Sequence, residues 1–240
     1  MKQKIAILHE DEDLVIINKP ARFLSIPDRF DETKPNVLGY LNRQHGKVFT
    51  VHRLDKETSG ILCFAKNELA HKALSQQFQE RTVEKIYYAL VDGILQPTSG
   101  SISFGIAPHP NRPGKMMVSA KGKKSLTTYQ LVEQFRNYAL VEANIKTGRT
   151  HQIRVHFEAI GHPLTIDAMY GNRSEFLLSS LKLKKYRPSK GHEERPLMSR
   201  TTLHAFRLEL DQPTTQKRLI IEAPLPKDFA AVVKQLQKWG

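Results

Sequence analysis

Asp55 is the side chain in this sequence with the clearest prospect of doing chemistry. It lies in "VHRLDKETSG", residues 51–60, between a β-rich run and a turn. A carboxylate can attack an electrophilic carbon, as glycosidase nucleophiles do at the anomeric centre. In a pocket it stays ionised only beside a cation, and the candidate partners are Arg53, Arg149 and Arg154. The alternative is a turn or surface ion pair in which Asp55 only stabilises the fold.

Other kinds of catalytic site find less support in the sequence. His151 and His156 are five residues apart, which does not stack two metal ligands on one helical face, and no HExxH or cysteine pair occurs. We therefore expect no metal, and the histidines, including His52, to act as structural hydrogen-bonding groups. The glycine signatures of phosphate-binding loops are absent too. No G-x-S-x-G surrounds Ser59, so Thr58 and Ser59 are expected to cap the turn through side-chain-to-backbone bonds.

Strands must position Asp55. Residues 5–18 predict two strands joined by an acidic turn at Glu10–Asp13, with Pro20 ending the second. Residues 48–54 alternate in a β-rich pattern, and "GILCFA" predicts a buried strand that holds Cys63 as a buried free thiol. The Asp55 motif is therefore expected on a strand–loop–strand connection.

Four segments predict helices. The clearest is 67–83, with Asn67 as N-cap and an apolar face of Leu69, Ala73, Leu74 and Phe78. The others are a short helix ended by Gly46, a helix within 147–161, and a closing helix over 227–239.

Strands dominate and few are joined by crossover helices, which indicates an α+β fold with a mixed, largely antiparallel sheet core and flanking helices and loops. No repeat or clean linker appears, so we expect one catalytic domain over 1–240. Residues 181–200 are rich in Lys, Arg and Pro and predict a long exposed basic loop.

Composition indicates a soluble cytoplasmic protein with a polyanionic partner. The net charge is +13 and the pI is near 9.8, which favours nucleic acid. No apolar run approaches the ~20 residues of a membrane helix, and the N-terminus lacks the pattern of a signal peptide. We therefore expect no membrane association, and a monomer by default.

Four segments, read in order, resemble the RluA-type pseudouridine synthases. They are "EDEDLVIINKPARFLS", "HRLDKETSGILCFAK", "EKIYYALV" and "IKTGRTHQIRVHFEAIGHPLTID", and the likeness runs from about residue 8 to 226. That family carries an HRLD-x-x-TSG motif, an upstream NKP, a K-x-Y-x-A strand and a TGR-x-HQIR-x-H segment. The resemblance implies an enzyme that converts uridine to pseudouridine in RNA without a metal or other cofactor.

The resemblance also implies roles for individual residues. Asp55 is the implied nucleophile, and Arg53 enters the RNA and helps expel the target base. Tyr87 stacks on the flipped uracil and helps remove the proton from carbon 5. Arg154 pairs with Asp55 and orients it, and Ile153 forms an apolar wall of the pocket. Two alternatives stay open for the carboxylate: attack on the anomeric carbon of the ribose, or attack on carbon 6 of the uracil ring.

Further cations are candidates for RNA contacts. Arg149 is interpreted as a phosphate binder or a structural ion-pair partner. In the basic loop, the phosphate-binding candidates are Lys182, Lys184, Lys185, Arg187 and Lys190. The alternative for these five is a solvated loop without a ligand.

Some features distinguish this chain within the family. Relatives often have glycine where this chain has Arg22, after "NKPA", and Lys19 is expected to stabilise that turn or to face RNA. The motifs begin so early that no S4 RNA-binding module is expected, as in compact members that act on a tRNA or large-subunit rRNA stem-loop.

Two alternatives belong to other functional classes. One is a basic RNA-binding or RNA-folding protein that keeps the fold without the chemistry. The other is a glycoside- or nucleoside-cleaving enzyme, against which stands the lack of a second acid placed as proton donor.

Overall fold

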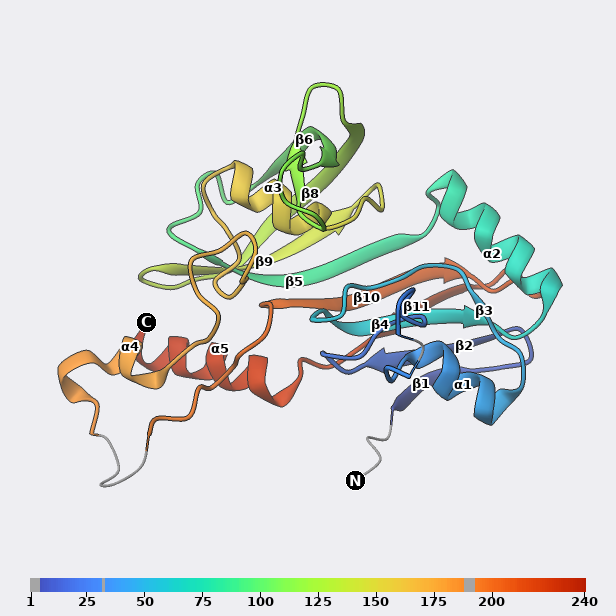
Figure 1. The fold of residues 1–240 in the computed structure, drawn as a ribbon, viewed down its shortest axis with the longest axis horizontal. Helices are drawn as coiled ribbons and strands as arrows, with labels where there is room; N and C mark the ends of the chain where they lie inside the picture. Colours follow the sequence, from blue (N-terminus) through green and yellow to red (C-terminus); the bar gives the residue numbers. More distant parts are fainter. Residues whose placement is uncertain (1–4, 32, 188–192) are drawn as a thin grey trace. The chain divides into compact units, whose positions relative to one another are not determined.

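The computed structural model describes residues 5–31, 33–187 and 193–240. The chain divides into two compact units, which Figure 1 shows in sequence colours. The first unit comprises Met1–Tyr87 and His204–Pro224, and the second comprises Tyr88–Leu203 and Leu225–Gly240. The expectation of one catalytic domain over 1–240 stays a prediction. None of the described helices is long and apolar enough to cross a membrane.

The first unit is a mixed sheet with two helices. Its elements are β1 (Ala6–Glu10), β2 (Leu14–Lys19), α1 (Val37–His45), β3 (Phe49–Thr50), β4 (Ser59–Ala65), α2 (Glu68–Glu80), β10 (Leu203–Asp211) and β11 (Arg218–Glu222). β1 pairs with β2, β2 and β3 with β4, and β10 with β11, all antiparallel. β4 and β10 pair in parallel. The predicted α+β class with a largely antiparallel sheet is confirmed.

The helix α2 packs on this sheet with much of the predicted face, since Leu74 and Phe78 both lie against the core, but not with Leu69. Asn67 caps it, since its side chain accepts a hydrogen bond from the Ala70 N–H at 2.8 Å. Ala70 and Leu74 are buried in the core with β2 and β4, whereas Leu69 is 84% exposed. The prediction that Leu69 lies on the apolar face is wrong. Successive helical residues diverge by about 100°, so the face that carries Ala70 and Leu74 turns Leu69 toward solvent.

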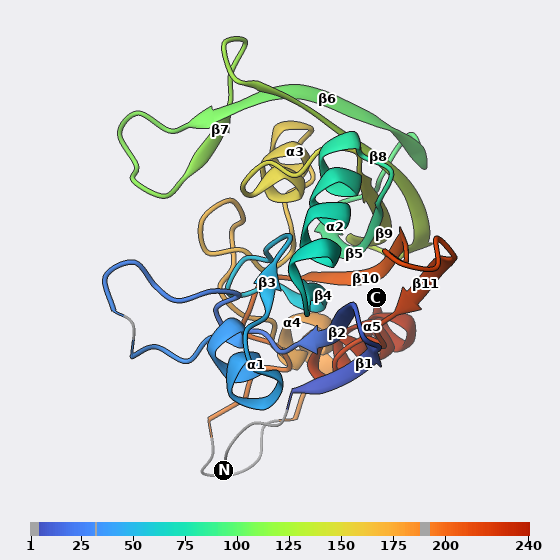
Figure 2. The same ribbon diagram turned by 90° about the vertical axis from the view of Figure 1, so that its right-hand side faces the viewer.

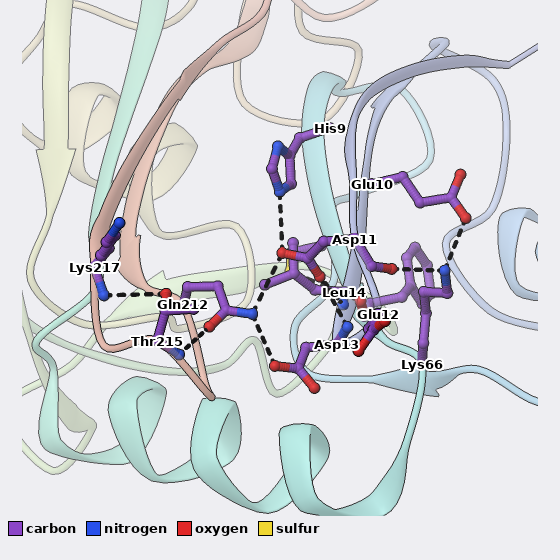
Figure 3. Close-up of polar contacts among 12 residues, drawn as sticks. His9, Glu10, Asp11, Glu12, Asp13, Leu14, Lys66, Gln212, Thr215 and Lys217 are labelled. Atoms are coloured by element: carbon purple, nitrogen blue, oxygen red, sulfur yellow. Dashed lines mark hydrogen bonds and ion pairs between the residues drawn. The ribbon is translucent and has the colours of Figure 1, made fainter.

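The β1–β2 turn is held by its own carboxylates (Figure 3). One Asp11 carboxylate oxygen accepts the N–H groups of Asp13 and Leu14 at 2.8 and 2.9 Å. Gln212, in the β10–β11 turn, donates to Asp13 at 2.8 Å, and Asn67 donates to Asp13 at 3.0 Å. The predicted acidic turn therefore joins three segments that lie far apart in the sequence.

The second unit contains an antiparallel meander and three α-helices. Its elements are β6 (Ser99–Pro108), β7 (Met116–Val118), β8 (Lys123–Gln134), β9 (Tyr138–Ile145), α3 (Gln152–Ala159), α4 (Leu178–Lys182), the 3-10 turn η1 (Leu183–Lys185) and α5 (Lys227–Trp239). β6 pairs with both β7 and β8, and β8 pairs with β9. β5 (Glu84–Asp92) runs from the first unit into the second. Figure 2 shows how β6 and β8 curve around α3, which contacts both strands.

The helix α5 supplies much of the second hydrophobic core. Phe229, Val232, Val233 and Leu236 are buried, at the i, i+3, i+4, i+7 spacing of an amphipathic helix. They pack with Phe176, which lies between α3 and α4, and with residues of β5 and β9. The expected basic loop at 181–200 is helical at its start, because α4 and η1 extend to Lys185.

Candidate active site

Asp55 lies in an irregular loop, 51–58, between β3 and β4. The predicted strand–loop–strand setting is confirmed, although the first strand ends at Thr50 and does not include His52. The Thr58 N–H donates to the Asp55 carbonyl oxygen at 3.1 Å, which closes the turn. Asp55 is half-buried and Arg53 is exposed.

Lys19, in the "NKP" segment, holds this loop through a backbone carbonyl. Lys19 is fully buried, and its ammonium donates to the carbonyl oxygens of Pro20, Phe23 and Lys56 at 3.1, 2.8 and 3.1 Å. The carbonyl of Lys56 belongs to the residue that follows Asp55. Lys19 therefore stabilises the turn, one of its two predicted roles, and its burial excludes the other, which was to face RNA.

Two further contacts fasten the loop to the same segment. The Ser25 hydroxyl donates to the Leu54 carbonyl at 2.8 Å and accepts the Leu54 N–H at 3.1 Å. The Arg22 N–H donates to the Lys56 carbonyl at 2.8 Å. Arg22 has a φ of 67°, the left-handed conformation that glycine adopts without strain. The turn therefore keeps the geometry that suits the family's glycine although an arginine stands there.

His52 anchors the loop on the side of β4. Its Nε2 accepts the Cys63 N–H at 3.0 Å, and its ring stacks on Phe78 with centroids 4.8 Å apart. Burial, and next the charge of Lys85, lower the pKa of His52 to about 3. The imidazole is neutral at physiological pH, which confirms the expected structural hydrogen-bonding role. Cys63 itself is a buried free thiol, as predicted.

The "TSG" part of the motif packs against β10. Ser59 bonds to His204 Nδ1 at 2.9 Å, and His204 Nε2 lies 3.1 Å from the Ala223 carbonyl oxygen, so Nε2 carries the proton and the Ser59 hydroxyl donates to Nδ1. The prediction that Ser59 bonds to backbone in the turn is therefore wrong. Gly60 has a φ of 115°, and a Cβ there would meet the Ala205 carbonyl oxygen at 2.2 Å. The motif needs glycine because β10 lies directly on it.

Tyr87 of β5 lies within electrostatic reach of Asp55. Its side chain is buried, and burial, then the charge of Asp55, raise the pKa of the phenol. The structure thus brings together the predicted nucleophile and the predicted stacking residue within the first unit. The next residue, Tyr88, packs against the core of the second unit, as the alternation along a strand requires.

Arg154 lies on α3 in the second unit and is bound by an acid that the sequence analysis missed. Its Nε and Nη2 donate to Asp167 at 2.6 and 2.8 Å, and Asp167 is fully buried. Burial raises the pKa of Asp167, but the hydrogen bonds and charge of Arg154 outweigh burial. The pKa therefore lies below its usual value, and the carboxyl stays ionised. The Arg154 guanidinium also lies 4.8 Å from the centre of the Tyr170 ring. The predicted pairing of Arg154 with Asp55 joins the two units and stays a prediction.

A polar network explains most of the "TGRTHQIRVH" segment. Gln152 is buried, accepts hydrogen bonds from the Thr147 hydroxyl at 2.6 Å and the Arg149 N–H at 3.1 Å, and donates to Thr127 at 2.9 Å. His156 bonds to Thr127 at 2.9 Å on one ring nitrogen and to Ser125 at 2.9 Å on the other. Burial lowers the pKa of His156 to about 4. These contacts fasten α3 to β8 and so fix the part of the chain that carries Arg154.

The remaining candidates among the described residues lie in the second unit. Ile153 is 4% exposed, on α3 beside Arg154. The Arg149 Nε donates to the Lys124 carbonyl at 3.3 Å. Lys182 ends α4, and Lys184 and Lys185 lie exposed in η1. Lys190 lies outside the described residues.

Comparisons with known proteins identify the family. A model described as RNA pseudouridylate synthase matches residues 13–159. The "Uncharacterized RNA pseudouridine synthase YhcT" of Bacillus subtilis is 35% identical over 233 residues, covering 94% of this chain and 70% of that protein. "Ribosomal large subunit pseudouridine synthase D" of Haemophilus ducreyi is 36% identical over 241 residues, 96% of this chain and 70% of that protein. The solved structure of "Human RNA Pseudouridylate Synthase Domain Containing 4" aligns with a TM-score of 0.75 at 28% identity, covering 97% of this chain and 93% of that one.

These matches and the HRLD loop define the class of protein. The chain belongs to the RNA pseudouridylate synthase family, in its RluA-type branch, as its motifs predicted. It is accordingly an RNA pseudouridine synthase, an isomerase that acts on RNA.

Proposed function

We propose that this enzyme isomerises one specific uridine in a tRNA or large-subunit rRNA stem-loop, with Asp55 as its nucleophile. The observation that carries the proposal is the Asp55 loop itself: its backbone is fastened by Lys19 and Ser25, and the charge of Asp55 reaches the buried phenol of Tyr87. A nucleophile must be held in a defined position to react efficiently. The name of the relatives called ribosomal large subunit pseudouridine synthase D supports an rRNA substrate.

The target uridine must leave the base stack before it reaches Asp55. Extruding a stacked nucleotide costs about a few kcal/mol. Stacking of the flipped base on Tyr87 returns roughly 1–3 kcal/mol, and Arg53, which is exposed in the same loop, enters the vacated position in the RNA. Ile153 supplies an apolar wall that keeps water from the reacting base.

The reaction conserves every atom of the nucleotide. The bond from the ribose anomeric carbon to N1 breaks, and a bond from the same carbon to carbon 5 forms. Carbon 5 loses a proton and N1 gains one, so no oxidant, reductant or water is consumed. Attack by Asp55 on the anomeric carbon or on carbon 6 satisfies this balance equally.

Tyr87 serves this reaction chiefly as a stacking platform. Burial and the Asp55 charge raise its pKa, so the phenol is protonated at neutral pH. To take the proton from carbon 5 it must first lose its own. A neutral phenol suits stacking, and it can donate a hydrogen bond to the base.

The cations of the second unit complete the proposed site. Arg154 orients Asp55, and its contacts with Asp167 and the Tyr170 ring fix the plane of the guanidinium. Arg149 binds a phosphate of the RNA, as do Lys182, Lys184 and Lys185. The reaction as proposed uses no metal or other cofactor.

Replacement of Asp55 by Asn tests the nucleophile. Pseudouridine would be mapped across total RNA from cells with and without the protein, and the site that disappears is the substrate. Asp55→Asn should lower product formation at that site by at least about 10³-fold, a loss typical of a nucleophile, while RNA binding is retained. Glu57→Gln, an acid change two residues away in the same loop, is the matched control and should still form product. Wild-type rates with Asp55→Asn would refute the nucleophile, and no mapped site in any RNA would refute the proposed activity.

A further inference from the structure

Three lysines converge on the single tryptophan of the chain. Trp239 ends α5, and the ammonium groups of Lys182, Lys185 and Lys238 lie 5.1, 5.6 and 5.3 Å from the centre of its rings. Lys182 and Lys185 come from α4 and η1, and α4 lies against α5 in both views of the ribbon (Figures 1 and 2). We call these four residues the Trp239 cluster.

The cluster carries an excess of positive charge. Among the described residues, none of its lysines has a carboxylate partner within 4.0 Å. Two acids that contact these helices are engaged elsewhere: Glu194 accepts the Ser179 N–H at 2.8 Å, and Glu133 accepts from Gln237 at 2.9 Å. The partial negative charge at the C-terminal end of α5 offsets only a fraction of three unit charges.

The indole explains why one cation is attracted, but not why three are. A cation–π contact at an exposed site contributes about 0.5–1 kcal/mol. Three ammonium groups around one ring also repel one another, and each added lysine raises that repulsion. An anion that binds among them would relieve it, so the cluster is better suited to a polyanion than to the protein alone.

We infer that the Trp239 cluster is an RNA-binding surface, on which phosphates bind the three lysines and the indole stacks on or lies against a base. This inference rests on the proposed RNA substrate, and it extends the predicted contacts of Lys182 and Lys185 to Trp239 and Lys238. Lysines that follow the backbone beside an aromatic ring are the usual composition of single-stranded nucleic-acid sites. The net charge of +13 makes the same partner the favoured one for the whole chain.

The fluorescence of Trp239 gives a direct test, because the chain has one tryptophan. A large-subunit rRNA transcript would be titrated into the wild-type protein while emission and filter binding are followed together. We expect the emission to change in step with occupancy. Unchanged emission at full occupancy would overturn the inference. A change with anionic phosphatidylglycerol vesicles and none with RNA would overturn it as well, and would assign the surface to a membrane.

A charge-matched pair of variants makes the test quantitative. Each phosphate contact contributes about 0.7–0.9 to the slope of log affinity against log salt. Lys182→Ala/Lys185→Ala/Lys238→Ala should therefore lower that slope by about 2. The control Lys72→Ala/Lys217→Ala/Lys234→Ala removes three exposed lysines from elsewhere and should lower it by less than about 1. Equal slopes for the two variants would contradict the inference.

The failure of this inference is separable from the failure of the proposed function. Asp55→Asn should lose product yet keep the change in Trp239 emission. Product formation with unchanged emission would refute RNA binding by the Trp239 cluster and leave the proposed enzyme activity standing. RNA-dependent emission without product in any RNA would support RNA binding by the Trp239 cluster and refute the proposed enzyme activity.

Discussion

Two aspartate-bearing connections of the first unit are held in opposite ways. In the β1–β2 turn, the carboxylates of Asp11 and Asp13 hold the chain, because they accept hydrogen bonds from backbone and side-chain amides. In the Asp55 loop, the chain is held through backbone groups of Leu54 and Lys56, which bond to Ser25 and Lys19.

The difference separates a structural acid from a candidate catalytic one. Where carboxylates hold the turn, their replacement should lower the free energy of unfolding. Where neighbouring backbone groups hold the loop, those hydrogen bonds do not use the side chain that the loop carries. A loop of this second kind can place a carboxylate for chemistry.

The largest effect is expected at Lys19. Lys19→Met keeps the length of the side chain but withdraws the donor from three carbonyl oxygens. The Lys56 carbonyl keeps the Arg22 N–H, so two acceptors are left, and an unsatisfied buried acceptor costs about 1–3 kcal/mol. We expect the free energy of unfolding to fall by about 3 kcal/mol and the rate of pseudouridine formation to fall with it. Denaturant titration checks the first, and product mapping the second. Lys72→Met, an exposed position on α2, is the control; equal stability of the two variants would refute the fastening role of Lys19.

A smaller, pH-dependent effect is expected at Asp13. Hydrogen bonds from Thr214, Asn67 and Gln212 lower its pKa, so the ionised carboxylate stabilises the fold above the ordinary Asp value of about 3.9. That stability is lost as the pH falls through the folded-state pKa. Asp13→Asn places an amide donor against other donors and should cost about 1–2 kcal/mol at neutral pH.

Unfolding measured along a pH series tests this prediction. The advantage of wild type over Asp13→Asn should shrink as the pH falls from about 5 to about 3. Glu12→Gln, an exposed acid in the same turn, should stay within about 0.5 kcal/mol of wild type at neutral pH. A wild-type advantage that persists undiminished at low pH would show that the Asp13 carboxylate does not hold the turn.

The smallest effect is expected at Arg22, which completes the fastening of the Asp55 loop. Arg22→Gly removes left-handed strain of about 1 kcal/mol, while added freedom of the unfolded chain costs about 0.5–1 kcal/mol. We expect a net change within about 0.5 kcal/mol. The loose pair of Arg22 with Glu57, at 3.9 Å, is exposed and adds little.

Arg22→Ala provides the comparison, because it removes the same side chain and keeps the strain. Thermal melts should therefore place the glycine variant level with or above the alanine variant. An alanine variant more stable by about 0.5–1 kcal/mol, the cost of the freedom of glycine with no strain relieved, would show that the turn does not hold residue 22 in the left-handed conformation in solution.

Much of the fold could be predicted because it depends on local patterns. The acidic turn, the Asn67 cap, the helix stop at Gly46 and the buried Cys63 each follow from a few neighbouring residues, and the structure has all four. Leu69 was misplaced because periodicity in the first turn of a helix does not reveal which face meets the sheet. The basic segment at 181–185 was expected to be loop because its charges hide the short helix that packs on α5.

The candidate site was less accessible to sequence reasoning because its contacts are long-range. The Arg154–Asp167 pair is 13 residues apart and spans a helix end and a turn, so no spacing rule predicts it. In the sequence, the acid that ends "GHPLTID" was the only signal for this pair. His204 bonds to Ser59 from 145 residues away, and no spacing in the sequence indicated that contact. Motifs therefore located Asp55 and Tyr87, while the residues that support them came from the fold.

The parallel pairing of β4 with β10 has a consequence for synthesis of the protein on the ribosome. Ser59 and Gly60 are made well before their neighbours on β10, His204 and Ala205, since Ser59 and His204 are 145 residues apart. A nascent chain interrupted before that point contains the whole HRLD-x-x-TSG sequence and has nothing to close over Gly60. Such a chain contains Lys19 and Ser25, which fasten the Asp55 loop, but lacks His204 and Ala205, against which Ser59 and Gly60 pack.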